Sequence, residues 1–239
     1  MYRLPVGPGA WAVTTTVHTP GPHPSARPFT LSYTATAPAD QVRAHRLLAE
    51  ELTDHRWHWA QQVHGAAVVT ATSNCPAPCP GHGPGDAVVA TLPAHAPAVL
   101  TADCVPVALA SCSGSVRVAI HAGRPGLLVG TIGAAIAAAR ALTDEPLYAR
   151  IGPHICAQCY EVDCALAEEV YLSHPEAQAT TSWGTPALDL TAMALTQLRA
   201  GGVVVESEAA PCTREDLRFP SHRRLPNGER LATAVLLRT

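Results

Sequence analysis

Four short apolar runs, at residues 87–91, 98–100, 105–109 and 116–120, constrain the fold more than any other feature of the sequence. Runs of this length and composition are typical of strands buried in a sheet. They are followed by a glycine-containing segment at 123–126 and a long apolar stretch at 127–142, which predict a turn and then a helix. The sequence therefore predicts a sheet covered by helices.

Local patterns predict the remaining elements. A helix is expected over 39–53, where Val42, His45, Leu48 and Leu52 recur at helical spacing. Two more helices are expected at 163–173 and 189–200, the latter capped by Asp189. Strands are expected at 59–72, 148–151, 203–205 and 231–237, with edge strands and loops over 1–38. Because no repeat or change in composition divides the chain, we predict one α/β (α+β) domain over residues 1–239.

The composition excludes several functional classes. A net charge of -3 without a basic stripe argues against nucleic-acid binding, and no apolar stretch is long enough to span a membrane. All 16 basic residues are arginine, which excludes a lysine Schiff base and a Walker-type phosphate loop. The N-terminal residues do not resemble a signal peptide, so we expect a cytoplasmic protein.

Two histidines and a cysteine have unusual surroundings. His64 follows a glutamine pair inside a predicted strand, Cys104 follows Asp103, and His121 ends an apolar strand. Two imidazoles and a thiolate can hold a zinc ion with one coordination position left open for catalysis. The same residues could instead form a cysteine nucleophile with a histidine base. The residues alone leave both alternatives open.

The neighbours of these residues suggest supporting roles. Asp103 could orient a ligand or cap a turn. Gly123 and Gly126, between a strand and a helix, could expose backbone N–H groups to an anion, and Arg124 would add charge. An ordinary strand-to-helix turn explains the glycines equally well.

Eight cysteines raise the question of a second metal site. In a cytoplasmic chain we expect thiols or metal ligands rather than disulfides. Cys156 and Cys159 have zinc-ribbon spacing, and Cys75 and Cys79 could complete a four-cysteine site. Free thiols in loops are the favoured interpretation.

Several motifs occur in order along the chain and resemble the YfiH, or polyphenol-oxidase laccase-domain, family. They comprise Gln62-Val63-His64-Gly65, Asp86-Ala87, Thr101-Ala102-Asp103-Cys104-Val105-Pro106-Val107, His121-Ala122-Gly123, Ile151-Gly152-Pro153, Tyr160-Glu161-Val162, Cys212-Thr213, Phe219, Ser221, Arg223 and Arg224. The resemblance runs from about residue 40 to the C-terminus, and residues 1–38 match least well.

The resemblance implies a layered sandwich of mixed sheets flanked by helices, with zinc bound by His64, Cys104 and His121. It implies phosphorolysis of adenosine, inosine and methylthioadenosine, deamination of adenosine, and a contribution to peptidoglycan-precursor editing. Purine nucleosides and phosphate are then the expected partners, and a monomer or weak homodimer is the expected state.

The chain departs from the family pattern at three places. Arg124-Pro125 stands where the family often has Trp-Arg, His45-Arg46 where it has Asn-Arg, and His222 where it has Tyr. Arg46, Arg124 and Arg223, with the Gly123 backbone, are the candidates for binding substrate or phosphate. Asp103 is expected to support catalysis beside the metal ligands.

Two other activities remain as alternatives. One is a metal-free amidase or deamidase that uses Cys104 and a histidine on peptidoglycan precursors. The other is a copper-dependent polyphenol oxidase. Copper is less favoured than zinc, since such sites usually add an axial methionine and the chain has only Met1 and Met193.

Overall fold

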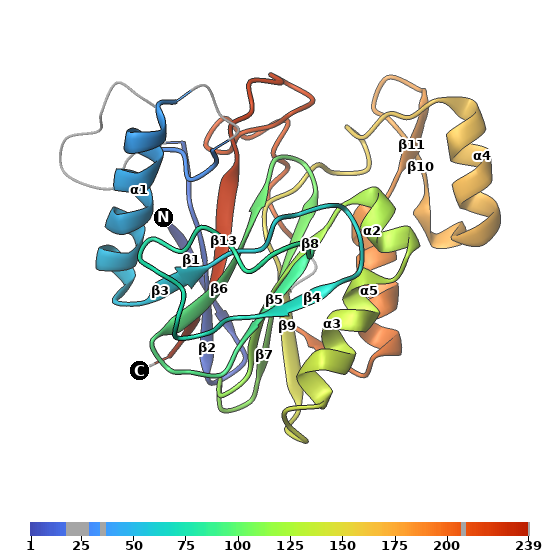
Figure 1. Cartoon of the computed structure of the whole chain (residues 1–239). Helices are drawn as coiled ribbons and strands as arrows, with labels where there is room; N and C mark the ends of the chain where they lie inside the picture. Colours follow the sequence, from blue (N-terminus) through green and yellow to red (C-terminus); the bar gives the residue numbers. More distant parts are fainter. Residues whose placement is uncertain (18–28, 34–36, 207–208, 239) are drawn as a thin grey trace.

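Two sheets packed face to face form the centre of the molecule (Figure 1). The computed structural model describes residues 1–17, 29–33, 37–206 and 209–238. The first sheet has the strand order β1-β2-β13-β6-β3 and the second has β12-β9-β7-β8-β5-β4. The strands of the first sheet are β1 (Tyr2–Val6), β2 (Ala10–Thr14), β3 (Arg56–His58), β6 (His95–Thr101) and β13 (Leu231–Leu237). Those of the second are β4 (Val68–Thr70), β5 (Ala87–Ala90), β7 (Val105–Ser111), β8 (Arg117–Ala122), β9 (Leu147–Ile151) and β12 (Val204–Val205).

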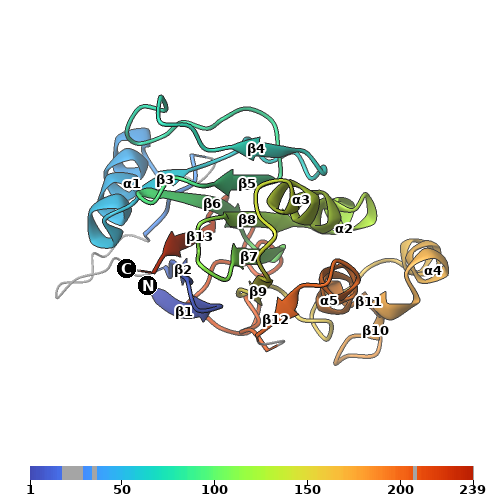
Figure 2. The same ribbon diagram turned by 90° about the horizontal axis from the view of Figure 1, so that it is seen from below.

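Small side chains allow the two sheets to approach closely. The cluster between them consists of alanines and valines from both sheets, including Ala12 and Val235 on one side and Ala108 and Ala119 on the other. Figure 2 shows the sheets side by side, with α1 (Ala39–Thr53) outside the first and α3 (Thr131–Arg140) and α5 (Leu190–Ala200) outside the second. The strands from 87 to 122 are therefore covered on both faces, as their apolar composition requires.

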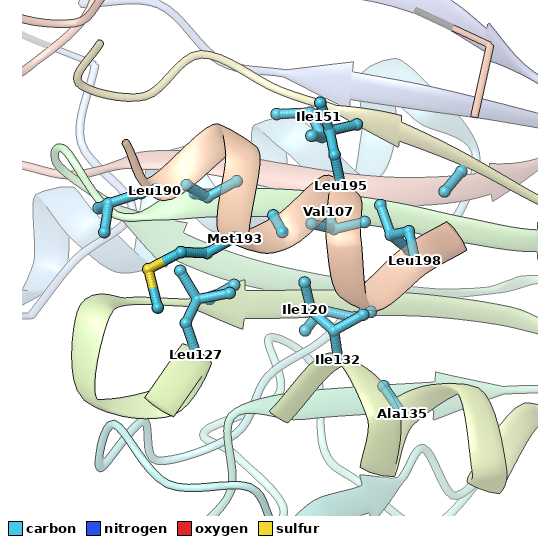
Figure 3. Packing of buried hydrophobic residues seen from close by; sticks show 14 of the residues in the cluster. Val107, Ile120, Leu127, Ile132, Ala135, Ile151, Leu190, Met193, Leu195 and Leu198 are labelled. Atoms are coloured by element: carbon cyan, nitrogen blue, oxygen red, sulfur yellow. The ribbon is translucent and has the colours of Figure 1, made fainter. Parts of the chain in front are cut away.

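Larger side chains fill the layer between the second sheet and its helices. Val107 and Ile120 from the sheet pack against Ile132 of α3 and Leu195 and Leu198 of α5 (Figure 3). Burying each such side chain contributes roughly 1.5–3 kcal/mol. A small hairpin, β10 (Gln178–Thr180) and β11 (Pro186–Leu188), lies beside α4 (Cys164–Ser173) at one end of the molecule (Figure 1).

The structure confirms the predicted fold class and most of the predicted elements. Helix α1 and strand β13 have the predicted bounds. Helix α5 begins after Asp189, whose side chain accepts a hydrogen bond from the Ala192 N–H at 2.9 Å. No helix among the described residues is long and apolar enough to cross a membrane.

Three local predictions are wrong. The expected long helix at 127–142 is divided into α2 (Arg124–Leu128) and α3, because Gly130 between them has a φ of 80°. The expected strand at 59–72 is formed only over β4, and His64 lies in a turn with a φ of 60°. In the N-terminal segment, β2 is paired on both sides and is not an edge strand. The predictions for residues 18–28 and 34–36 lie outside the described residues.

Candidate functional site

The register of β7 and β8 brings Cys104 to His121. Val105 pairs with Ala122 and Pro106 with His121 across these antiparallel strands. Cys104 directly precedes β7, so it lies at the same end of the sheet as His121 near the end of β8. Neighbouring positions in the sheet, 17 residues apart in sequence, thus place a thiol beside an imidazole.

His64 completes a group of three possible metal ligands, called here the open group (His64, Cys104 and His121). Their ligand atoms all lie within 4.8 Å of one another. His64 Nε2 is 3.9 Å from Cys104 Sγ, and the two imidazole rings meet edge to face at 4.7 Å between centroids. His121 is buried, Cys104 is partly buried and His64 is exposed, so the group opens toward solvent on the His64 side.

A buried carboxylate, Asp86, fixes two members of the open group. Its Oδ1 accepts hydrogen bonds from His121 Nδ1 at 2.7 Å and from the His64 N–H at 2.9 Å, and its Oδ2 accepts one from the Gly65 N–H at 2.7 Å. Burial favours protonation of Asp86, but these hydrogen bonds outweigh it and lower the pKa of the carboxyl. Because Nδ1 of His121 is engaged, Nε2 is the nitrogen left for a metal.

Charge coupling within the open group favours a thiolate. Burial raises the pKa of the Cys104 thiol, but hydrogen bonds to His121 and His64 outweigh this and lower it to about 6. Burial lowers the pKa of His121, but Asp86 and Cys104 raise it to about 9. A thiolate is the form that binds metals and attacks electrophiles, so the arrangement suits either chemistry.

Gly123 is required by close packing. A Cβ atom there would lie 2.8 Å from Cδ2 of His64 and 3.0 Å from Sγ of Cys104.

The predicted anion site at Gly123 required a long helix to begin directly after this residue. Helix α2 spans only the five residues Arg124–Leu128, so the structure gives no support to that site.

Two cavities meet at the open group. The larger, of about 710 Å³, is lined by all three members of the group together with Tyr33, Arg46 and other residues. The smaller, of about 250 Å³, is lined by Asp103, Arg124, Tyr160 and Arg223, among others. Ala102, Cys104 and His222 line both cavities.

The three predicted arginines lie in two different places. Arg46 lines the larger cavity, but its guanidinium donates to the carbonyls of Leu31 and Cys79 and lies 4.5 Å from the ring centroids of both Tyr33 and Trp59. Burial lowers the pKa of Arg46 to about 10. Its contacts therefore hold the wall of the cavity together.

Arg124 and Arg223 line the smaller cavity together. Arg223 Nη1 donates to the Glu161 carbonyl at 2.7 Å, and its guanidinium lies 4.7 Å from the Tyr160 ring centroid. These contacts fix the Arg223 guanidinium at the edge of the cavity.

Asp103 has a different position from the one expected. Its carboxylate accepts hydrogen bonds from Thr213 Oγ1 at 2.6 Å and from the Arg223 N–H at 2.7 Å. Asp86 rather than Asp103 contacts a ring of the open group. The sequence alone did not assign this role to Asp86. Its position directly before a fully buried apolar strand is unusual, but it does not identify His121 as the partner.

The structure rules out the four-cysteine site, which was the less favoured alternative. Cys75 and Cys79 form a disulfide, contrary to the expectation of thiols, and pack in the core beneath α1. Cys159 belongs to a different core cluster, on the helix-covered face of the second sheet. Cys156 and Cys159 instead lie near Cys212 and Glu215.

Comparisons with known proteins agree with this architecture. Residues 14–238 match the family model described as multi-copper polyphenol oxidoreductase laccase. A purine nucleoside phosphorylase of Streptomyces coelicolor is 45% identical over 184 residues, covering 75% of this chain and 74% of the relative. One from Mycobacterium tuberculosis is 36% identical over 197 residues, covering 81% and 77%.

Solved structures show the same fold over nearly the whole chain. A protein of Neisseria meningitidis is 27% identical with a TM-score of 0.79, covering 96% of this chain and 95% of the other. YlmD of Geobacillus stearothermophilus is 26% identical with a TM-score of 0.79, covering 97% and 93%. The chain thus belongs to the laccase-like family of multi-copper polyphenol oxidoreductase proteins, which includes these phosphorylases.

Proposed function

We propose that this protein is a zinc-dependent purine nucleoside phosphorylase that acts on adenosine, inosine or methylthioadenosine. The observation that carries the proposal is the meeting of a large and a small cavity at Cys104. Phosphorolysis needs a nucleoside and a phosphate held side by side, which two adjoining cavities of unequal size would allow. The names of the relatives, which are 30–45% identical, support the same reaction.

The open group fits a metal ion with a free coordination position. Nε2 of His121, Nε2 of His64 and Sγ of Cys104 would be the ligands. When bound, zinc supplies Lewis-acid polarisation of a substrate oxygen or of water. Met193 is fully buried in the core around α5 and lines neither cavity, so it does not supply the axial ligand that blue-copper sites usually have, which favours zinc over copper of that type.

The larger cavity has the size and chemistry for a nucleoside. It is lined by the aromatic ring of Tyr33 and the side-chain amide of Gln61, which can contact a purine base and hydrogen-bond its edge. The open group lies in the same cavity, so the sugar or base would lie against it.

The smaller cavity is suited to phosphate. Arg124 and Arg223 bring two positive charges to it, and arginine recognises phosphate through paired hydrogen bonds. In the reaction, a phosphate oxygen forms a bond to C1′ of the ribose while the C1′–N9 bond breaks. The electron pair of that bond passes to the purine, which takes up a proton. The arginines would orient the phosphate and offset its charge.

The same site offers a second activity, deamination of adenosine. In that reaction water adds to C6 of the base and ammonia leaves. The placing of the open group in the lining of the larger cavity favours it, because a base bound there would lie against the residues that would hold the metal.

Product analysis distinguishes these reactions. Purified enzyme is incubated with adenosine, inosine or methylthioadenosine, with and without phosphate, and the products are separated by chromatography. Phosphorolysis predicts free base only when phosphate is present, and deamination predicts inosine from adenosine without phosphate. No turnover of any nucleoside by zinc-loaded enzyme would contradict the proposal.

The metal-free alternative has its own signature. The chain of contacts from Asp86 through His121 to Cys104 also resembles an activated cysteine nucleophile. Full activity in enzyme stripped of metal, abolished by alkylation of Cys104, would favour that alternative and contradict zinc dependence.

A further inference from the structure

A second cluster of cysteine and histidine lies outside the open group, behind the wall of the larger cavity. We call it the closed group (His58, Cys75, Cys79 and His82). His58 ends β3, and the other three lie on the loop between β4 and β5. Their ligand atoms all lie within 4.8 Å of one another. His82 Nε2 is 2.8 Å from His58 Nδ1 and 3.5 Å from Cys79 Sγ.

We propose that the closed group binds a divalent metal ion of the zinc type when its cysteines are reduced, and that the Cys75–Cys79 disulfide is its oxidised, metal-free state. Two cysteines and two histidines are a common ligand set of structural zinc sites. Four ligands from the protein leave no position for a substrate, which distinguishes this site from the open group.

A disulfide between Cys75 and Cys79 does not by itself explain why two histidines lie beside it. The His58 ring is fully buried, and its Nδ1 faces Nε2 of His82 at 2.8 Å, with Cys79 Sγ 3.5 Å from the same His82 nitrogen. A disulfide alone does not require two ring nitrogens to face each other beside its sulfur atoms. Coordination of one ion by these atoms would account for their arrangement.

The charges of the closed group also suit a buried metal. Histidine binds a metal as a neutral ring, so His58 and His82 add no charge to the site. Two thiolates cancel the charge of a divalent ion. The complex therefore carries no net charge, which reduces the desolvation cost of placing it in the core.

Conversion between the two states is a balanced two-electron step. A thiol reductant gives two electrons and two protons to the disulfide, forming two cysteine thiols while the reductant becomes a disulfide. Metal binding then displaces the two thiol protons. In the reverse step, a disulfide oxidant accepts two electrons and is reduced to two thiols, which re-forms the Cys75–Cys79 bond and releases the ion.

The closed group lies where it would stabilise the substrate cavity. Pro80, Gly81 and Gly83 of its loop line the larger cavity. The His82 N–H donates to the Trp59 carbonyl at 2.9 Å, and the Gln61 N–H donates to the Gly83 carbonyl at 2.8 Å. A metal in the closed group would therefore attach this loop to the segment that leads to His64.

The test measures zinc bound per chain in a Cys104→Ala background, in which the open group is disabled. The protein is reduced with a phosphine, stripped of metal, and titrated with Zn²⁺ in competition with a chelator. His82→Gln keeps both cysteines, and Cys79→Ser removes one of them. His174→Gln and Cys112→Ser, which lie outside every cysteine–histidine group among the described residues, are the matched controls.

In competition with a chelator, we expect His82→Gln and Cys79→Ser each to retain about one zinc fewer than the reduced parent, because the three remaining ligands hold the ion more weakly than four, whereas both controls match the parent. Zinc bound by Cys156 and Cys159 would be common to all variants and would not affect the difference. Oxidised parent protein should also bind about one zinc fewer than reduced parent. Equal zinc retention against the chelator by reduced parent, His82→Gln and Cys79→Ser would overturn the proposal.

Replacing zinc with Co²⁺ gives a second readout. Thiolate-to-cobalt absorption is expected in the reduced Cys104→Ala protein and should be weaker in Cys79→Ser, with folding checked by circular dichroism. An unchanged absorption in folded Cys79→Ser would overturn the assignment of Cys79 as a ligand.

Discussion

The open and closed groups use the same two kinds of side chain for different purposes. The open group has three potential ligands, one of them exposed, and two cavities meet at it. The closed group has four, of which His58, Cys75 and Cys79 are buried. The number of ligands and their exposure to solvent, rather than the residue types, distinguish a site that can react with a substrate from a purely structural site.

The support behind each group differs as well. In the open group, the Asp86 carboxylate accepts hydrogen bonds from the His121 ring and from the backbone N–H of His64. In the closed group, the His58 ring stacks on His95 at 4.3 Å between centroids, and its Nε2 has no hydrogen-bond partner among the described residues. Orientation by hydrogen bonds raises the basicity of a ligand and suits a reactive metal. The difference between the groups can be tested by substitution.

The largest effect is expected from removing a ligand of the open group. His121→Ala should reduce phosphorolysis by more than about 100-fold, a larger loss than is usual for residues that only support a ligand. Steady-state rates with saturating phosphate measure this loss. His82→Gln, in the closed group, should retain most of the activity. Full phosphorolysis by folded His121→Ala would remove the open group from the mechanism.

A smaller loss is expected from the carboxylate behind His121. Asp86→Asn keeps the shape of the side chain but removes its charge and one acceptor, so zinc affinity and kcat/KM should fall about 10–100-fold. Metal-competition titration and kinetics measure the two quantities. Asp189→Asn, at the cap of α5, is the matched control and should affect neither. Asp86→Asn with normal zinc affinity would show that the hydrogen bond to His121 has no supporting role.

A still smaller and more selective effect is expected in the smaller cavity. Arg124→Ala should raise KM for phosphate about 10-fold, the loss of roughly one charge-assisted hydrogen bond, and leave KM for the nucleoside nearly unchanged. Arg43→Ala removes an exposed arginine of α1 and controls for net charge. Equal changes in both KM values would place Arg124 outside a phosphate site.

The smallest effect concerns pH. In metal-free enzyme the pKa of Cys104 is lowered to about 6, so its thiolate predominates above that pH and is lost as the pH falls below it. The rate of Cys104 alkylation should follow this titration, and added zinc should suppress it. In His121→Ala the midpoint should move up toward the ordinary thiol range. A midpoint that stays near pH 6 in this variant would show that His121 does not stabilise the thiolate.

Features set by local sequence could be predicted. Helix α1, strand β13 and the Asp189 cap follow from periodicity and short-range hydrogen bonding, and the structure confirms all three. The break at Gly130 was missed, because the apolar pattern continues through it and only the backbone conformation interrupts the helix.

Features set by pairing between distant segments could not be predicted. Asp86 reaches His121 because β5 pairs with β8, and neither strand contains a local sign of that register. The surroundings of the cysteines could not be predicted either. His58, at the end of β3, lies near Cys75 and Cys79, and Cys212 lies near Cys156 and Cys159. The motifs in order along the chain predicted the family, which the comparisons confirm, while the metal roles of the open group remain predictions.

The most direct test of the contrast between the two groups is anomalous diffraction at the zinc edge from crystals of the reduced, zinc-loaded protein. We expect one peak bonded to His64, Cys104 and His121 and a second peak enclosed by His58, Cys75, Cys79 and His82. Absence of zinc from the open group in a preparation that carries out phosphorolysis would contradict zinc dependence.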